Sequence, residues 1–384
     1  MSDGNTVYSV GTVNVVKFLF ASFFLSQFLY VYSGDIIFQL LNMLIGVLSF
    51  FYIYPYVSRY GWGYIILVTI FATLTTLLSL KFKFGDIIFA ATMPFFAILL
   101  NLFRRELKWP ALCFCILTIC YCGYAIVMGW DLNTQLFQSS SRNYISVLCI
   151  FSFYCVVISS AQNTIKIILL ILVSIIILYS NSRSAFISFS IVLLFYILKI
   201  SSIFKKTSIV ILLVMLAILP LLIINHFTEI YNYLYDSLGI VRRLSVGELS
   251  DTGRFDVIKC YYEKLDPLSI LLGLDYLSNN QCSFLANGTD NPHNSFIRLF
   301  SNLGFFSFII IILLFWSLLR TVLKKNYLVL SLMLCFILRG GTDILFFFQT
   351  WDAYLYSIIF ISLPEVFFNM KGQDRIKLIN FWNN

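Results

Sequence analysis

The sequence predicts an all-α integral membrane protein, because its composition suits lipid and its long apolar segments suit helices. Of the 384 residues, 60% are hydrophobic and 11% are charged, and the mean hydropathy is +0.89. No compact globular surface could keep such a composition in water. Segments such as 165–178, in which Lys166 near the start is the one charged residue, and 305–319 are otherwise apolar on nearly every side, which is typical of spanning helices and not of the alternating strands of a membrane barrel.

A spanning helix needs about 20 apolar residues, so the chain has room for about 12 such helices with short connections. Hydropathy places them at 15–33, 36–57, 62–80, 86–103, 109–129, 143–161, 164–181, 184–203, 207–225, 293–319, 326–341 and 350–368.

Lysine and arginine in short loops indicate which ends of the spans face the cytoplasm. When the spans alternate, one face receives three basic loops and the C-terminal tail, with Arg104, Arg105, Lys108, Lys205, Lys206, Arg320, Lys324, Lys325, Lys371, Arg375 and Lys377. Both termini are therefore expected in the cytoplasm, and Lys81 and Lys83 are the exceptions on the outer face. The net charge of +8 fits this basic excess and attraction to anionic membrane lipid, so no nucleic-acid partner is expected.

The chain is expected to have three parts: spans in 1–225, a long external (periplasmic) loop in 226–292, and spans with a cytoplasmic tail in 293–384. Apolar residues recur at helical spacing over 227–238, which predicts an amphipathic helix on the membrane surface. A second short helix is expected to start near Asp251 or Thr252 and to end at Asp266-Pro267. Its predicted buried stripe consists of Phe255, Ile258 and Tyr262.

The nine cysteines mostly fall inside predicted spans, where a thiol behaves as a small apolar group. Cys113, Cys115, Cys120 and Cys122 have no histidine or carboxylate beside them, so no metal site is predicted there. Cys260 and Cys282 lie in the external loop, where an oxidising compartment would allow a disulfide. Both the bridged and the free state stay open at this point.

Three of the basic residues on the predicted outer face stand out: Arg183 in Asn-Ser-Arg-Ser-Ala, Arg254 in Asp-Thr-Gly-Arg-Phe, and His293 at a span start. Each has a simpler interpretation, since arginines extend to lipid headgroups or water and a histidine serves as a polar helix end. Together, however, two planar guanidinium groups suit a diphosphate, and a histidine titrates near neutral pH. We therefore expect an anion clamp beside a general base.

At these residues the chain resembles the bacterial O-antigen polymerase and O-antigen ligase superfamily, the Wzy and WaaL types of membrane glycosyltransferase. The resemblance covers the second half best. Its motifs, in order, are Ser182-Arg-Ser-Ala185, Gly253-Arg254, Leu271-Leu-Gly-Leu274 and His293-Asn-Ser295 followed by Gly304. The first half matches only in hydropathy and at Arg142-Asn143. It has few polar residues, which is a departure from the family, so the residues that bind the acceptor stay unassigned.

The resemblance implies glycan transfer from an undecaprenyl-diphosphate-linked donor to a hydroxyl of another lipid-linked sugar, at the outer face of the bacterial cytoplasmic membrane. Arg183 and Arg254 would neutralise the leaving diphosphate, and His293 would take the acceptor proton, with inversion at the anomeric carbon. Weaker substrate contacts are expected from Arg142, Asn143, Asn294 and Arg298. Neither a metal nor another cofactor is expected, and a chain-length regulator protein is compatible as a partner.

Three alternatives stay open. An O-antigen ligase shares this chemistry and differs in its acceptor, the lipid A core. A capsule or exopolysaccharide polymerase fits equally well. A lipid-linked oligosaccharide flippase or other transporter would also have about 12 spans, but it should carry ionisable residues near mid-membrane, where the predicted spans hold almost none.

Overall fold

The computed structural model describes residues 10–78, 84–130, 135–138, 143–180, 182–203, 254–274 and 294–369. Every regular element in these ranges is a helix, and one isolated antiparallel bridge joins Val57 and Phe368. The predicted all-α class is thereby confirmed for the described part of the chain. Six helical segments in it are long and apolar enough to cross a membrane: Gly11–Ser33, Ile36–Tyr56, Arg59–Leu78, Phe84–Leu102, Arg104–Val127 and Ser295–Leu323. Shorter apolar helices lie at five further predicted spans.

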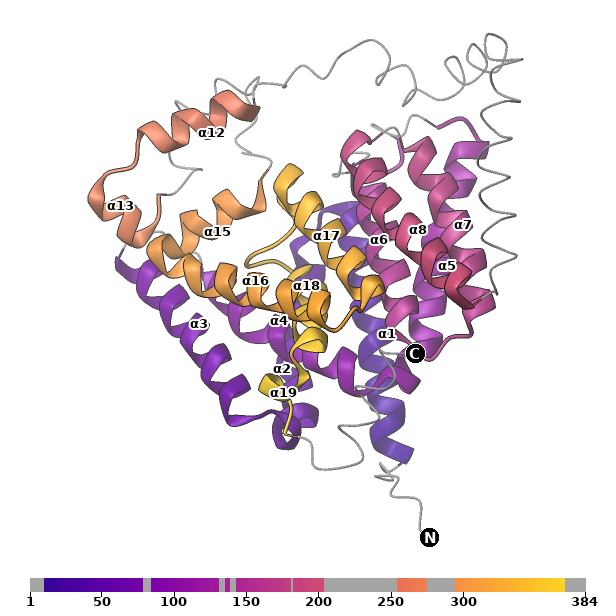
Figure 1. Ribbon diagram of the computed structural model, residues 1–384, viewed down its shortest axis with the longest axis horizontal. Coiled ribbons are helices and arrows are strands. Elements are labelled where there is room, and N and C mark those ends of the chain that lie inside the picture. The colour runs from indigo at the N-terminus through magenta and orange to yellow at the C-terminus, as the bar shows by residue number, and fades with distance from the viewer. Residues whose placement is uncertain are drawn as a thin grey trace. The chain divides into compact units, whose positions relative to one another are not determined.

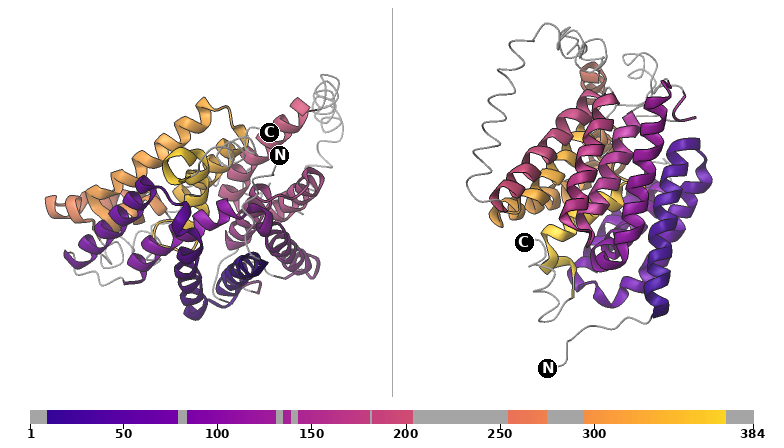
Figure 2. Two further views of the ribbon diagram at one scale, coloured as in Figure 1. Left: turned by 90° about the horizontal axis from the view of Figure 1, so that it is seen from below. Right: turned by 90° about the vertical axis from the view of Figure 1, so that its right-hand side faces the viewer.

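The chain divides into two compact units, and the first contains Met1–Thr69, Phe84–Val173 and Phe348–Arg375. Its helices, drawn in Figures 1 and 2, are α1 (Val10–Ser33), α2 (Ile36–Ile53), η1 (Tyr54–Tyr56), α4 (Phe84–Leu102), α5 (Arg104–Val127), α6 (Asn143–Ile158), α18 (Asp352–Ser362) and α19 (Pro364–Phe367), with the first parts of α3 (Arg59–Leu78) and α7 (Asn163–Tyr179). Within this unit α4 packs against α2 and α18, and α5 packs against α1 and α6.

Aromatic rings and a few paired polar groups fill the core of the first unit. Phe23 of α1 stacks on Phe96 of α4 with their centroids 3.8 Å apart. Ser357 of α18 accepts a hydrogen bond from the Tyr154 hydroxyl at 2.8 Å, and its carbonyl accepts one from the Asn101 amide at 2.9 Å. Such paired buried polar groups fix the relative rotation of α4, α6 and α18, because breaking a pair leaves an unsatisfied group.

The second unit contains Ile70–Lys83, Ser174–Phe347 and Ile376–Asn384. Its further helices are α8 (Arg183–Ile203), α12 (Arg254–Glu263), α13 (Pro267–Leu272), α15 (Ser295–Leu303), η3 (Gly304–Phe306), α16 (Ser307–Leu323) and α17 (Tyr327–Thr342). Polar side chains cap three of them: Asp266 starts α13, Asn294 starts α15 and Asn326 starts α17. In this unit α17 packs along α8 and against α16, while α13 and α15 pack against η3.

Two predicted spans are wrong in their continuity. The span at 350–368 is divided into α18, which ends at Ser362, and α19, which begins at Pro364. The expected helix at 293–319 is interrupted, because α15 ends at Leu303 and the 3-10 turn η3 begins at Gly304, whose φ is +53°. The full stretch Ser295–Leu323 has 29 residues, and one straight helix of that length would rise about 44 Å, well beyond the hydrocarbon core of about 30 Å. The predicted span 207–225 and the predicted surface helix 227–238 lie outside the described residues.

The second short helix predicted within 226–292 is present as α12, but its predicted buried stripe is wrong by one residue at the positions whose side chains the structure describes. Val257 and Tyr261 are buried, whereas Tyr262 is 69% exposed. The Tyr261 hydroxyl donates to the carbonyl of Leu274 at 2.7 Å, which turns this side of α12 inward. The predicted break at Asp266-Pro267 is confirmed, since Asp266 caps α13 there.

Candidate functional site

The structure describes the predicted site residues to different extents. Arg183 is the first residue of α8 and Arg254 is the first residue of α12, but their side chains lie outside the described part. Arg142 and His293 lie outside the described residues altogether. The described side chains are those of Asn143, which begins α6 in the first unit, and of Asn294 and Arg298 at the start of α15 in the second.

Asn294 joins the start of α15 to the end of α17. Its side-chain oxygen accepts hydrogen bonds from the backbone N–H groups of Phe296 at 2.8 Å and Ile297 at 3.3 Å, as an N-cap does. Its Nδ2 group donates to the carbonyl of Gly341 at 3.2 Å. Arg298 follows one turn later on α15 and is half-buried. The predicted substrate contacts of Asn294 and Arg298 stay predictions, and capping is the role that the geometry gives Asn294.

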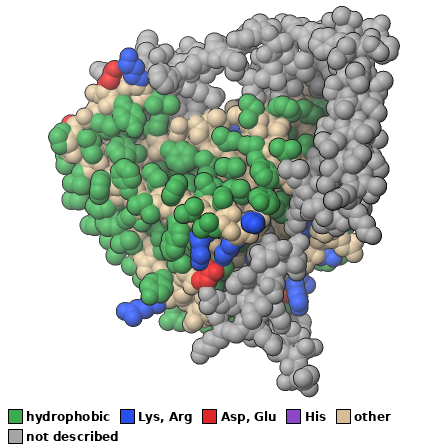
Figure 3. Space-filling model, in the orientation of Figure 1, with side chains coloured by type: hydrophobic (Ala, Val, Ile, Leu, Met, Phe, Trp, Pro, Cys, Tyr) green, Lys and Arg blue, Asp and Glu red, His purple; other side chains and the backbone are tan. Residues whose placement is uncertain are grey.

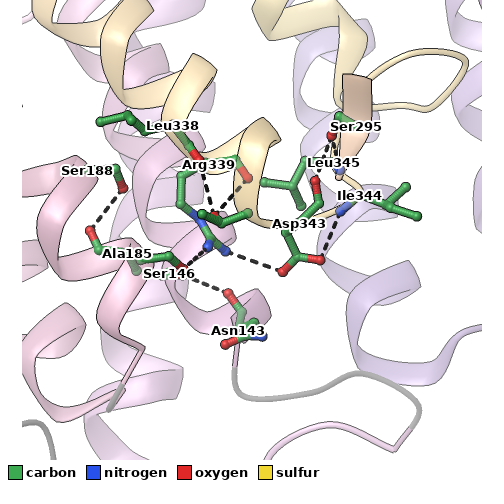
Figure 4. A network of polar contacts seen from close by, with 12 residues as sticks. Asn143, Ser146, Ala185, Ser188, Ser295, Leu338, Arg339, Asp343, Ile344 and Leu345 are labelled. Carbon is green, nitrogen blue, oxygen red and sulfur yellow. Dashed lines mark hydrogen bonds and ion pairs between the residues drawn. The ribbon is translucent and has the colours of Figure 1, made fainter. Parts of the chain in front are cut away.

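A buried ion pair in the last turn of α17 lies beside these residues. Arg339 Nη2 lies 3.7 Å from Asp343 Oδ2, with only 2% and 9% of the two side chains exposed. Arg339 Nη1 also donates to Ser184 Oγ on α8 at 2.6 Å. Figure 4 shows the guanidinium group between α8 and the carboxylate, whose other oxygen accepts a hydrogen bond from the N–H of Ile344 at 2.9 Å.

Ser295 connects the start of α15 to the segment that follows α17. Its hydroxyl donates to the carbonyl of Asp343 at 2.7 Å and accepts from the N–H groups of Leu345 at 2.9 Å and Phe346 at 3.1 Å (Figure 4). One donor and two acceptor positions are all that a hydroxyl offers, so its capacity is fully used. The side chain has no exposed area, which makes it an internal clasp and not a ligand for a bound molecule.

These contacts bring two distant parts of the sequence to one place. Ser184 directly follows Arg183, and Asn294 directly follows His293. Both described residues bond to the last turn of α17, Ser184 through Arg339 and Asn294 through Gly341. The segment 339–343 therefore fastens the start of α8 to the start of α15.

Two glycines fasten α13 onto the chain after α15. Gly273 has φ +85° and Gly304 has φ +53°, conformations that favour glycine. A Cβ at Gly273 would lie 2.3 Å from the carbonyl oxygen of Ser301, and one at Gly304 would lie 2.3 Å from that of Leu271. Only glycines permit this approach of backbone to backbone. Both belong to the motifs on which the family resemblance depends.

Sequence reasoning missed Arg339, Asp343 and the clasp of Ser295. A signal was present, since Arg339-Gly-Gly-Thr-Asp343 puts opposite charges four residues apart at the end of an apolar stretch. Charged residues that are buried in the described helices lie in terminal turns and not at helix centres: Arg104, Lys166, Arg339 and Asp352.

The segment predicted to be external differs from the apolar helices in the state of its cysteine. Cys260 on α12 is disulfide-bonded, whereas the cysteines of the described spans, including Cys113, Cys115, Cys120 and Cys122, are free thiols. The predicted partner, Cys282, lies outside the described residues. Hydrogen bonds from the side chain and backbone of Ser269 lower the pKa of the Asp266 carboxyl, which keeps the cap of α13 charged. Within the described part of the chain, no group of three or more His, Cys, Asp or Glu residues could hold a metal ion.

A comparison with known protein families and with curated proteins finds no match for this chain. The resemblance to the polymerase and ligase superfamily therefore depends on the short motifs alone and stays a prediction.

Proposed function

We propose that this protein is a metal-independent, inverting membrane glycosyltransferase that joins undecaprenyl-diphosphate-linked oligosaccharide repeat units, as an O-antigen or related surface-polysaccharide polymerase. The observation that carries the proposal is the attachment of Ser184 and Asn294 to one turn of α17. A diphosphate-binding arginine and a general base need to act on one substrate at once, and the residues directly after Arg183 and His293 share one anchoring segment.

In the proposed reaction, the acceptor hydroxyl attacks the anomeric carbon of the donor as the bond to the diphosphate oxygen breaks. His293 takes the hydroxyl proton, and Arg183 and Arg254 neutralise the negative charge that develops on the departing diphosphate. A single displacement inverts the anomeric configuration. The buried Arg339–Asp343 pair and the Ser295 clasp supply the rigidity that such a site requires.

The proposal includes a topology of about 12 spans with cytoplasmic termini and the loop 226–292 outside the membrane. The disulfide at Cys260 supports it, because disulfides persist in oxidising compartments such as the bacterial periplasm. The outer face of the bacterial cytoplasmic membrane is also where undecaprenyl-diphosphate-linked repeat units would be presented to this loop.

A transporter of lipid-linked oligosaccharides is a second candidate, and a specific observation favours it. A buried ion pair, Arg339 with Asp343, lies in the unit that also contains a helix broken at Gly304. Buried charges and discontinuous helices are common at the substrate sites of transporters. An O-antigen ligase is a third candidate, and it would differ only in using the lipid A core as acceptor.

Deletion of the gene, followed by a gel of the lipopolysaccharide, separates these candidates. Loss of a polymerase should leave the core with a single repeat unit, whereas loss of a ligase should leave bare core and accumulated lipid-linked polymer. Loss of a transporter should leave bare core without lipid-linked polymer at the outer face. An unchanged ladder would exclude O-antigen as the product, and a capsule assay would then test the remaining polymerase alternative.

A further inference from the structure

The helices α12 and α13 carry apolar side chains that are exposed in the described part of the second unit. Leu268 is 64% exposed and Ile270 is 47% exposed on α13, and Tyr262 at the end of α12 is also exposed. Lys259 and Glu263 form an exposed ion pair on α12, 3.9 Å apart. In Figure 3, charged side chains lie at the upper left over α12, and a mostly apolar surface lies below them. The short pair of helices is therefore amphipathic.

The level of α13 relative to a bilayer follows from α16. The 3 residues of η3 and the 17 residues of α16 together rise about 30 Å, which equals the thickness of a hydrocarbon core. Lys324 and Lys325 directly follow α16 and mark one edge of that core. The turn η3 therefore lies at the opposite edge, and α13 packs directly on η3 through Gly273 and Gly304.

The same edge is reached independently along α17. This helix packs against α16, starts at Tyr327 just after the two lysines, and ends at Thr342 after 16 residues, about 24 Å along its axis. Asn294 bonds to Gly341 in its last turn, so the start of α15 lies at the edge where η3 lies. In the proposed topology, both ends of α15 thus lie at one boundary, and α15 runs along the membrane surface.

We infer that α12 and α13 form an interfacial anchor whose apolar side chains insert into the leaflet at which α16 begins. The occupant of the exposed patch is the acyl-chain region of bilayer lipid. Because α13 packs on η3, the patch adjoins a surface that faces lipid in the proposed topology. This surface consists of exposed side chains on one helical face of η3 and α16: Phe305, Phe308, Ile312, Phe315 and Leu319. The ion pair Lys259–Glu263 stays on the aqueous side, as in other interfacial helices.

If the proposed function holds, the anchor also has a consequence for the position of Arg254. Arg254 is the first residue of α12, so an anchored α12 keeps this residue's segment at the depth of lipid headgroups. The diphosphate of a lipid-linked donor lies at that depth, so the arginine need not be carried there by a loop movement.

Photocrosslinking in the full-length protein tests the anchor. The photoreactive residue p-benzoylphenylalanine replaces Leu268 or, as the matched control, Lys259, and the protein is illuminated in vesicles of phosphatidylethanolamine and phosphatidylglycerol. We expect a severalfold excess of lipid adducts at position 268 over position 259, measured by mass spectrometry. If the variant at 268 fails to accumulate, the same replacement at Ile270 gives the same readout.

Equal lipid labelling at the two positions would overturn the anchor. Crosslinks from position 268 to another segment of this chain, or to a second protein, would overturn it as well, because the patch would then have a protein occupant. The readout uses no sugar substrate. A failed anchor therefore leaves the proposed function standing, and an enzyme without polymerase activity can still give the expected labelling.

Discussion

At the scale of single residues, the strongest features of the second unit are a buried ion pair and a saturated hydroxyl. Arg339 contacts both Asp343 and Ser184, and the Ser295 hydroxyl bonds to three backbone groups. Buried charges are costly unless they are paired, and buried hydroxyls are costly unless they are bonded. The main effect of both features is therefore to fix one packing arrangement of α8, α15 and α17. Their net contribution to the free energy of unfolding is smaller.

Breaking the ion pair from one side should destabilise the protein strongly. We expect Arg339→Ala or Asp343→Ala to cost about 3 to 5 kcal/mol, because each leaves an uncompensated buried charge. The double variant Arg339→Met with Asp343→Leu should recover much of that loss, since both charges are gone. Thermal unfolding in detergent measures all three, and a double variant no more stable than either single one would contradict a coupled pair.

Removing the hydroxyl of Ser295 should loosen the segment after α17. Ser295→Ala leaves the N–H groups of Leu345 and Phe346 without their acceptor, at a cost of about 1 to 3 kcal/mol. The matched control is Ser331→Ala on α17, whose equally buried hydroxyl bonds only to the carbonyl of Leu328 in its own helix. Equal unfolding temperatures for the two variants would refute the role of Ser295 as a clasp.

At the scale of elements, the contact of α13 with η3 depends on two glycines in the left-handed region. We expect Gly304→Ala to separate α13 from η3, because the added methyl group would meet the backbone of Leu271 at 2.3 Å. Limited proteolysis between 254 and 274 should then become faster. Gly341→Ala on α17 is the control, since a Cβ there meets nothing within 4 Å. Equal proteolysis of the two variants would show that the close approach is not required.

The elements also show what sequence could predict and what it could not. Hydropathy located the helices from α1 to α8 and the break at Asp266-Pro267 within a few residues. It missed the interruption at Gly304, because apolar residues continue on both sides and only the backbone of Leu271 explains the turn. The stripe of α12 was displaced by one residue for a similar reason, since the partner of Tyr261 is the carbonyl of Leu274.

The candidate site was predictable where it depends on local sequence motifs and not where it depends on long-range contacts. Short motifs drew attention to the starts of α8 and α15, and the structure fastens the residues after Arg183 and His293 to one turn. The fastening segment itself was missed, because pairing between Arg339 and Ser184 crosses 155 positions in the sequence. No local pattern encodes such a contact.

At the scale of the whole molecule, the predicted membrane topology can be tested separately from the chemistry. Reporter fusions after Lys206 and after Arg320 should read cytoplasmic, and a fusion near Asp251 should read external, because basic short loops stay on the cytoplasmic side. Expression-matched fusions in the intact chain provide the measurement. A cytoplasmic signal at Asp251 would put the proposed site in the wrong compartment and exclude the mechanism.

The most direct test of the proposed polymerase function is to measure polymer formation by the purified protein. The protein is placed in vesicles that contain lipid-linked repeat units and a metal chelator. The wild-type protein should form a ladder, and Arg183→Ala and Arg254→Ala should each reduce its rate about a hundred- to a thousandfold, as loss of an electrostatic stabiliser does. His293→Ala should lose about a hundred- to ten-thousandfold in rate, the usual contribution of a positioned base, while still binding the donor. Near-normal polymerisation by His293→Asn would contradict the general base, and a wild-type protein that forms no polymer from its donor would contradict the proposed function itself.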